Sequence, residues 1–213
     1  MATPFFWLTA PLCLLLALLL ADFFSGLVHW AADTWGKYDK NSPTASWVRP
    51  FRHHHIDPQS IVRHNFVERN GSATLFVLPI VGVALFIQPI PYISFVFKLT
   101  LILFSLAINL TNQHHAWAHS KNTPKIVFWL QKHHVILNKS IHNFHHTKPF
   151  ASTYCITTGW LNPFMEKIKF FPTLEVIIYK ITGLIPREDD LGRKMAMKVL
   201  RLRLKNSIFA RLI

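Results

Sequence analysis

A run of about 20 apolar residues near the amino end most constrains what this chain can fold into. Residues 11–30 read PLCLLLALLLADFFSGLVHW, and a helix of that length crosses the roughly 30 Å hydrocarbon core of a bilayer. Since no Lys or Arg precedes Lys37, the run lacks the basic leader of a signal peptide and is interpreted as an uncleaved membrane helix over residues 11–31. A carboxylate facing lipid is costly, so Asp22 is expected to face protein or to lie off-centre.

Two further apolar stretches, at residues 73–88 and 92–111, flank the sequence Gln88-Pro89-Ile90-Pro91. Two prolines in four residues break a helix, so these stretches predict a helical hairpin, with a second arm short enough to be tilted or only partly inserted. Only 15% of the residues are charged, against roughly 25% in an average soluble domain. The pattern excludes an ordinary soluble protein and predicts an all-α integral membrane protein with about three to four membrane-embedded helices.

The distribution of basic residues predicts the orientation. Six of the 23 Lys and Arg residues lie in residues 37–70 and sixteen follow Leu110, whereas none precedes Lys37. By the positive-inside rule, the amino end faces outward, while residues 37–70 and 112–213 form a cytoplasmic or interfacial cap on one domain spanning residues 1–213. The expected location is therefore multi-pass, with the active site on the cytoplasmic side, in a bacterial inner membrane or the endoplasmic reticulum.

Three basic segments in the carboxyl half have amphipathic patterns: residues 125–137, 170–184 and 193–213. Helices of this kind lie in the headgroup plane of a membrane, or they pack on the rest of the domain through their apolar faces. Their sequences favour neither arrangement over the other.

Thirteen histidines outnumber the ten acidic residues, and they occur in clusters on the predicted cytoplasmic side. The clusters are His29 with Asp33; His53, His54 and His55 with His64; His114, His115 and His119; and His142, His145 and His146, preceded by His133 and His134. Basic, histidine-rich stretches can also bind phosphate through charge alone. Four clusters near the predicted helix ends instead favour a metal centre.

Spacing converts these clusters into geometry. His29 and Asp33 are four residues apart, so on a helix they project from one face toward a common ligand. The same relation holds for His115 with His119, and for the three histidines at 142, 145 and 146. All three groups are expected near the cytoplasmic boundary, where they would meet at a shared centre.

The number and type of ligands limit the metals. A zinc site takes three or four protein ligands, so eight or more histidines with a carboxylate predict two ions in a dinuclear centre. The two cysteines, Cys13 and Cys155, are far apart and define neither a disulfide framework nor a cysteine-rich site, which excludes iron–sulfur clusters and thiolate-rich copper sites. Imidazole suits iron, zinc, copper and nickel alike, so ligand type alone does not choose among them.

Four segments give the chain a recognisable likeness: HWAADTWG, RPFRHHHIDPQSIVRHNFVERNG, TNQHHAWAHS and HHTKPFASTYCITTGWLNP, with PREDD near the carboxyl end. They resemble the lipid desaturase family, which includes plasmanylethanolamine desaturases and plant plastid desaturases, over about residues 29–190. The context around the histidines is most similar to the plasmanylethanolamine branch. The resemblance implies a membrane enzyme with two iron ions that uses O2 to remove two hydrogens from a lipid chain, forming in that branch the vinyl ether of plasmalogens.

The resemblance also implies which residues bind the irons. Carried over by position, the ligands are His29, Asp33, His54, His55, His115, His119, His142, His145 and His146. In the plasmanylethanolamine branch the position of His53 is usually acidic and that of His114 apolar, so both are expected to be neighbours of the site. His64 and His134 fit that branch but not the plant one, and are expected beside the ligands, as additional ligands or on the substrate side.

Partners follow from the same chemistry. The sequence has no dinucleotide-binding GxGxxG and no haem-attachment CxxCH, so electrons are expected from an external donor such as a b-type cytochrome or a ferredoxin. The net charge of +13 suits an acidic partner and anionic headgroups of the membrane, and no nucleic acid is expected. The substrate is expected to be a phospholipid whose alkyl chain lies in an apolar tunnel.

Other functions remain open from the sequence alone. A fatty-acyl phospholipid desaturase or a lipid hydroxylase would use the same centre. A zinc-dependent membrane hydrolase would need a carboxylate general base, for which Glu68 is the candidate. A metal transporter or regulator without chemistry would instead place its ligands at the membrane midplane.

Overall fold

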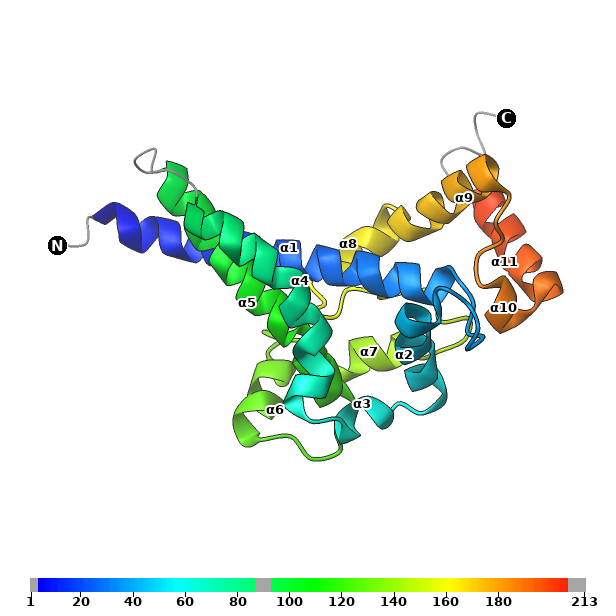
Figure 1. Ribbon diagram of the computed structural model, residues 1–213, viewed down its shortest axis with the longest axis horizontal. Helices are drawn as coiled ribbons and strands as arrows, with labels where there is room; N and C mark the ends of the chain where they lie inside the picture. The colour runs from blue at the N-terminus through cyan, green and yellow to red at the C-terminus, as the bar shows by residue number, and fades with distance from the viewer. Residues whose placement is uncertain (1–3, 87–92, 207–213) are drawn as a thin grey trace.

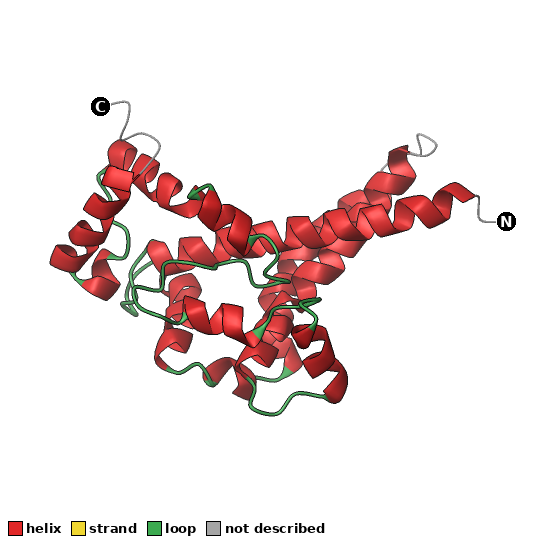
Figure 2. Cartoon of the chain, turned by 180° about the vertical axis from the view of Figure 1, so that it is seen from behind, coloured by secondary structure: helices red, strands yellow, loops and turns green. Residues whose placement is uncertain are grey.

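The computed structural model describes residues 4–86 and 93–206, and every regular element within those residues is a helix (Figure 2). The helices in chain order are α1 (Pro4–Thr34), α2 (Ala45–Ile56), α3 (Ser60–Arg63), α4 (Phe66–Phe86), α5 (Ile93–His119), α6 (Lys125–Lys132), α7 (Lys139–His145), α8 (Asn162–Lys167), α9 (Phe170–Thr182), α10 (Glu188–Leu191) and α11 (Arg193–Asn206). The prediction of an all-α chain is confirmed.

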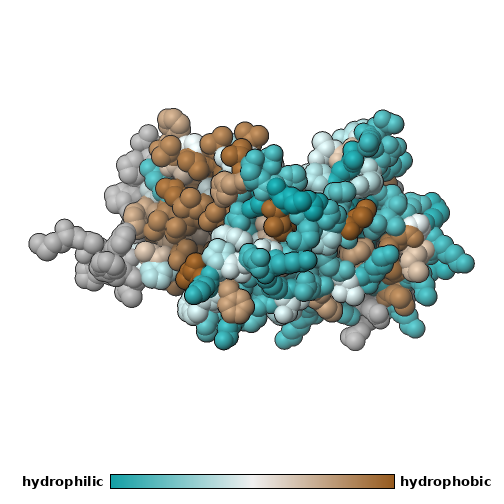
Figure 3. Space-filling model, turned by 90° about the horizontal axis from the view of Figure 1, so that it is seen from below, coloured by the Kyte–Doolittle hydropathy of each residue, from teal (hydrophilic) through white to brown (hydrophobic). Residues whose placement is uncertain are grey.

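Three of these helices are long and apolar enough to cross a membrane: the segments Thr9–Thr34, Phe66–Phe86 and Ser94–His119. They extend together on one side of the molecule, where α5 packs against both α1 and α4 (Figure 1). Ala17 and Ala21 are completely buried in this contact, because small side chains let two helices approach closely. Apolar side chains gather on the outside of this arm, whereas the rest of the molecule is mostly hydrophilic (Figure 3). The arm therefore matches a multi-pass membrane protein.

The second membrane helix is longer than its apolar stretch predicted. Helix α4 begins at Phe66, because Asn65 and Glu68 form a capping box: each backbone N–H donates to the other side chain, at 2.9 and 3.0 Å. With 21 residues the helix is long enough to cross a membrane, although its apolar stretch is shorter, and partial insertion stays a prediction. The predicted turn at residues 88–91 lies outside the described residues.

The third membrane helix also continues beyond its apolar stretch, to His119. The polar residues after Leu110 stay helical because they find partners there. Thr111 donates its hydroxyl to the carbonyl of Ala107 (3.0 Å), and the amide of Asn112 donates to the carbonyl of Arg69 (2.8 Å). This extension carries His115 and His119 on the same rigid rod as the membrane-spanning segment.

Asp22 points into the protein, as expected. Its side chain is completely buried and accepts hydrogen bonds from backbone N–H groups of the segment between α7 and α8. A buried carboxylate at membrane depth is tolerated because these donors replace its hydration.

The carboxyl half packs on the end of α1 through a buried cluster of charges. Glu175 of α9 accepts hydrogen bonds from Arg187 (2.6 Å) and from the indole N–H of Trp30 (3.2 Å), and it also pairs with Arg203 of α11. Two of the three amphipathic segments, in α9 and α11, are thus held against the protein by these contacts. The third forms α6, and residues 207–213 of the last segment lie outside the described residues.

Candidate metal centre

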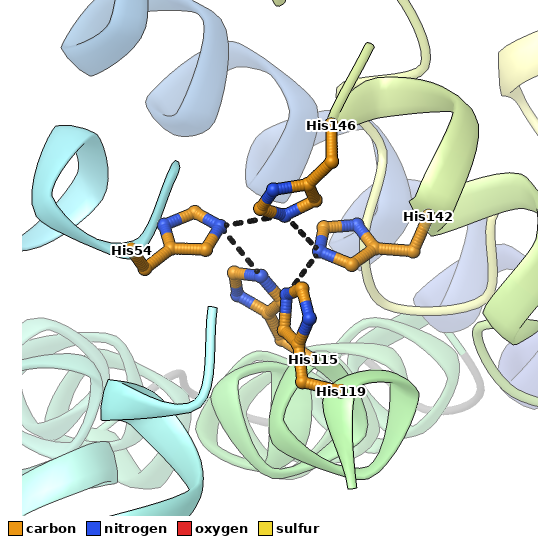
Figure 4. Close-up of side chains that lie close together, drawn as sticks. All are labelled: His54, His115, His119, His142 and His146. Atoms are coloured by element: carbon orange, nitrogen blue, oxygen red, sulfur yellow. Dashed lines mark hydrogen bonds between the residues drawn. The ribbon is translucent and has the colours of Figure 1, made fainter. Parts of the chain in front are cut away.

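Five histidines from three helices converge at one point beneath the membrane arm. Their ligand nitrogens all lie within 4.8 Å of one another, and Figure 4 shows the rings pointing toward one another. The Nε2 atoms of His119 and His142 are 2.7 Å apart, and those of His142 and His146 are 3.0 Å apart. The Nε2 atom of His54 lies 3.1 Å from that of His146 and 3.2 Å from that of His115. We call this set the five-histidine group.

A second set lies directly beside it and includes the single carboxylate. His29, Asp33, His55 and His145 also place their ligand atoms within 4.8 Å of one another. The Oδ2 atom of Asp33 is 3.2 Å from His29 Nε2, 3.4 Å from His145 Nε2 and 3.6 Å from His55 Nε2. We call this set the carboxylate group. The two groups together bring all nine predicted ligands into one centre.

The groups are adjacent because the same helices supply both. Helix α2 directs His54 into the five-histidine group and the next residue, His55, into the carboxylate group, with ring centroids 4.7 Å apart. Helix α7 likewise sends His142 to the first group and His145 to the second. Two neighbouring ligand sets sharing their supporting helices have the arrangement of a dinuclear metal centre.

The helices that carry these residues are positioned by local sequence. Asn138 begins α7 by accepting the backbone N–H of Ser140 on its side chain (2.7 Å). Buried Arg52 holds α2 against the end of α1: its Nε donates to the carbonyl of Ala32 (3.2 Å), and its Nη1 pairs with Asp189. Because Ala32 precedes Asp33, this contact fixes the ligands of α2 relative to the carboxylate.

The five histidines of the two groups that lie outside the membrane segments are neutral at neutral pH. Burial lowers the pKa of His55 to about 3 and that of His146 to about 2, and repulsion by neighbouring imidazoles adds to the effect. For His55 the nearby Asp33 raises the pKa, but by less than burial lowers it. Burial also lowers the pKa of His54, His142 and His145. Neutral imidazole is the form that binds metal ions.

Backbone carbonyls determine which ring nitrogen faces the centre. Three Nδ1 atoms lie close to backbone carbonyl oxygens. The Nδ1 atom of His29 is 3.1 Å from the oxygen of Tyr154, and the Nδ1 atom of His54 is 2.5 Å from the oxygen of Phe51. The Nδ1 atom of His145 is 2.8 Å from the oxygen of Ser152. A carbonyl only accepts, so each Nδ1 carries the hydrogen and donates it. Each Nε2 then presents a lone pair to the centre, as in metal-bound histidines.

Atoms at the centre lack partners, which tests whether a cation fits. His29 Nε2 and both carboxylate oxygens of Asp33 are buried without a hydrogen bond. Lone pairs and a carboxylate facing one another in a buried site are unfavourable unless a cation lies among them. These nitrogen and oxygen donors suit iron, zinc, copper or nickel. Cys13 and Cys155 are buried and free, and neither is in either group.

The remaining histidine candidates lie outside the two groups. His114 is buried and donates Nδ1–H to the carbonyl of Thr157 (2.8 Å). His53 is exposed, with its Nδ1 atom 3.2 Å from the hydroxyl of Tyr38. His134 is exposed beyond α6. Its ring is in neither ligand group, so nothing here supports a role at the site.

His64 and Glu68 lie at the edge of a cavity that leads to the centre. Their side chains are 3.4 Å apart and more than half exposed, and Glu68 also caps α4. The cavity, of about 400 Å³, is bordered by His54 and His115. His64 thus lines the same cavity as two members of the five-histidine group, and its substrate-side role stays a prediction.

A second, apolar cavity of about 310 Å³ adjoins the first and is lined mainly by side chains of α1, α4 and α5. The two cavities share Trp47, Phe51, Ser72 and Asn112. The apolar cavity is further lined by Phe24, Ser25, Val28, Ala73, Phe76, Ile108, Thr111 and Ile156. Together the cavities form a path from the membrane helices to the histidines, and sequence reasoning identified none of the residues that line its apolar part.

Sequence reasoning also missed the contacts that orient the ligands. The carbonyls of Ser152 and Tyr154 leave no mark in the side-chain pattern, because any residue provides a carbonyl. The sequence signal that could have indicated this segment is Asp22, since a carboxylate inside an apolar run needs hydrogen-bond donors from another part of the protein.

Comparison with known proteins gives a consistent result. A family model described as a lipid desaturase domain matches residues 18–189. The chain is 43% identical over 183 residues to a plasmanylethanolamine desaturase of Myxococcus xanthus (85% of this chain, 65% of that protein) and 42% identical over 207 residues to plasmanylethanolamine desaturase 1 of Mus musculus (91% and 74%). It is 31% identical over 176 residues to a chloroplastic fatty acid desaturase 4 of Arabidopsis thaliana (79% and 51%). The chain thus spans just under two thirds of the length of the bacterial relative, and no solved structure matches it.

Proposed function

This chain belongs to the lipid desaturase family, and on that premise we propose that it is a membrane lipid desaturase with two iron ions, which uses O2 and external electrons. The most similar relatives above point to plasmanylethanolamine as the substrate and the vinyl-ether double bond of a plasmalogen as the product. The observation that carries the proposal is the convergence of eight histidines and one carboxylate from four helical segments into two adjacent groups.

The five-histidine group would hold one iron and the carboxylate group the other. When bound, the two irons would supply oxygen-dependent removal of hydrogen from an unactivated C–H bond, which no acid or base of the protein could achieve. Burial keeps His55 and His146 neutral, and backbone carbonyls direct the Nε2 lone pairs of His29 and His145 inward. Asp33 contributes the single negative charge of the two groups.

The two cavities would bind the lipid. The alkyl chain would lie against Phe24, Phe76 and Ile108 in the apolar cavity, which is bordered by membrane-facing helices. The polar cavity, with His64 and Glu68, would take the glycerol and headgroup end. Burial of the alkyl chain in the apolar cavity favours this orientation of the lipid, with its headgroup end in the polar cavity.

The position of the histidines along this path supports a double bond near the headgroup. His54 and His115 line the polar cavity, and neither lines the apolar one. Carbons at the polar end of a bound chain would therefore lie closest to the centre. The first two carbons of an ether-linked alkyl chain, which form a vinyl ether, meet this requirement.

The reaction needs reductant from outside the chain. Two hydrogens leave the lipid, while O2 takes up two electrons and two protons as well, giving two molecules of water. A donor protein such as a b-type cytochrome or a ferredoxin would provide the electrons. The net charge of +13 suits an acidic donor.

Lipid mass spectrometry tests the proposed function. Cells that make plasmanylethanolamine but no plasmalogen, expressing this chain, should gain an acid-labile ether lipid two mass units lighter than its precursor. A His119→Ala variant expressed at the same level is the control. A new double bond in an ester-linked chain would show that the substrate is an acyl lipid rather than an ether lipid. A product gaining one oxygen atom would indicate a hydroxylase, and hydrolysed lipid would contradict an oxidoreductase.

The centre would face the cytoplasm, following the distribution of basic residues. Both natural cysteines are buried, so labelling of introduced cysteines has a low background. In intact cells, a membrane-impermeant maleimide should label Gln88→Cys, between α4 and α5, but not Asp39→Cys, on the cap. The reverse labelling pattern would place the centre on the outer side.

A further inference from the structure

The segment between α7 and α8 is held by one carboxylate of a membrane helix. Oδ1 of Asp22 accepts the backbone N–H groups of Thr157 (3.1 Å), Thr158 (2.8 Å) and Gly159 (2.9 Å), and Oδ2 accepts that of Leu161 (3.0 Å). Asp22 is completely buried. Hydrogen bonds to a charged group are about twice as strong as neutral ones, so this anchor is strong.

Neighbouring contacts extend the anchor toward the start of the segment. Ser25, three residues after Asp22, accepts the backbone N–H of Ile156 (3.2 Å). Asn162 makes two bonds with the backbone of Cys155, both of 2.9 Å. A Cβ atom on Gly26 would lie only 2.7 Å from Cys155 Sγ, so the segment approaches α1 where only a glycine leaves room.

The opposite side of the same segment faces the metal centre. Its carbonyls at Ser152 and Tyr154 accept the Nδ1–H groups of His145 (2.8 Å) and His29 (3.1 Å). Both rings belong to the carboxylate group. The segment is tied to the five-histidine group less directly: it begins with His146, and Thr157 bonds to Thr111 (2.7 Å) and His114 (2.8 Å) of α5. Among the described residues, no ring of that group donates to a carbonyl of residues 147–161; His54, for example, donates to the carbonyl of Phe51 in its own helix.

We propose that Asp22 is a positioning residue that acts mainly on one of the two metal ions, the one in the carboxylate group. Its carboxylate fixes the segment, the segment fixes two carbonyls, and the carbonyls hold His29 and His145 with Nε2 toward the metal. This inference rests on the proposed two-metal function. Loss of such outer partners typically weakens metal binding 10- to 100-fold.

The test is a comparison of Asp22→Asn with the wild type, purified in detergent and loaded anaerobically with iron(II). The side-chain amide has the same shape, but its N–H₂ group opposes one of the backbone donors. Both proteins are dialysed against increasing concentrations of a chelator, and the iron that stays bound per chain is measured. Wild type should lose its two irons over one range of chelator concentration. Asp22→Asn should lose one of its irons at a 10- to 100-fold lower concentration than wild type does. Mössbauer spectra should show one iron environment altered clearly more than the other.

Two further variants control for a general loss of structure. Ser25→Ala removes a weaker contact of the same segment and should shift the same iron in the same direction, by less. Thr100→Val changes a buried side chain of the membrane helix α5. The Thr100 hydroxyl donates to the carbonyl of Val96 in the same helix (2.8 Å), so this variant should leave the binding of both irons unchanged.

The outcomes separate this inference from the proposed function. Wild-type protein that binds no iron would contradict the two-iron proposal. If wild type binds two irons, equal weakening of both in folded Asp22→Asn, or unchanged affinity and spectra, would overturn the selective role of Asp22. If Asp22→Asn does not fold, Ser25→Ala decides by the same criterion.

Discussion

The Nε2 atoms of His119 and His142 lie 2.7 Å apart, although these residues are 23 positions apart and belong to different helices. Two ring nitrogens each bound at about 2.1 Å to one ion lie roughly 3 Å apart, so the pair has the separation expected of ligands that share a metal. The contact between α5 and α7 therefore brings two ligands from different helices to one metal position.

Removing one ligand from either group should abolish the reaction. His119→Ala takes a ligand from the five-histidine group and His145→Ala takes one from the carboxylate group. Each should reduce bound iron from about two to about one per chain and lower turnover at least about 100-fold. Metal analysis and lipid mass spectrometry measure both quantities. His133→Ala, an exposed histidine outside both groups, should retain iron and turnover; substantial activity in either ligand variant would count against the assignment.

Narrowing the apolar cavity should impair substrate use without affecting the metal. Ala73→Phe places a ring between α1 and α4, where it competes with the lipid chain for space near Phe24 and Phe76. We expect kcat/KM to fall about 10-fold, since misfit of a few methylene groups has effects of that order. Leu75→Phe, on the exposed side of α4, is the matched control. Equal activity of the two variants, at equal iron content, would mean that the lipid binds elsewhere.

Glu175 should be more important for stability than a surface carboxylate. It lies between the guanidinium groups of Arg187 and Arg203, both largely buried. Glu175→Ala would leave these charges uncompensated and should lower the free energy of unfolding by about 3–5 kcal/mol. Glu188→Ala breaks an exposed pair with Arg193 and should change it by less than about 0.5 kcal/mol. Denaturant unfolding in detergent measures both, and similar effects would disprove the buried pairing.

Metal-free protein should lose stability in mild acid. Burial lowers the pKa of His55 to about 3 and of His146 to about 2, so the folded protein keeps them neutral where an unfolded chain, with a pKa of about 6.5, binds protons. The unfolded state then holds more protons, and stability decreases as the pH falls below about 6.5, by up to about 1.4 kcal/mol per pH unit for each histidine.

Thermal unfolding of the metal-free protein at about pH 7.5 and about pH 5.5 measures this effect. The iron-loaded protein should be less sensitive over this range, because bound metal stabilises the folded state. A midpoint that is constant or rises in acid would show that the histidines are solvated rather than buried.

Much of the fold follows from local sequence. Apolar runs predicted the positions of α1, α4 and α5, and the spacing of His115 with His119 predicted that both face the same way. The ends of the helices were less accurate. Helix α4 begins where Asn65 and Glu68 cap it, and the capping box rather than hydropathy decides that point.

The division of the ligands could not be predicted. His54 and His55 are adjacent in the chain, yet they enter different groups, because the packing of α2 beside α1 decides which ring reaches which ligands. The cavities were equally out of reach, since they form between side chains of α1, α2, α4 and α5.

The sequence by itself determined the membrane-spanning helices and the pairs of ligands within each helix, because the length of an apolar run and the helical repeat are properties of a single segment. Only the tertiary structure decided that these pairs meet in two groups and that Asp22 holds the segment which orients His29 and His145. Distances between segments depend on how helices pack and on which buried groups find partners, and no single segment contains that information.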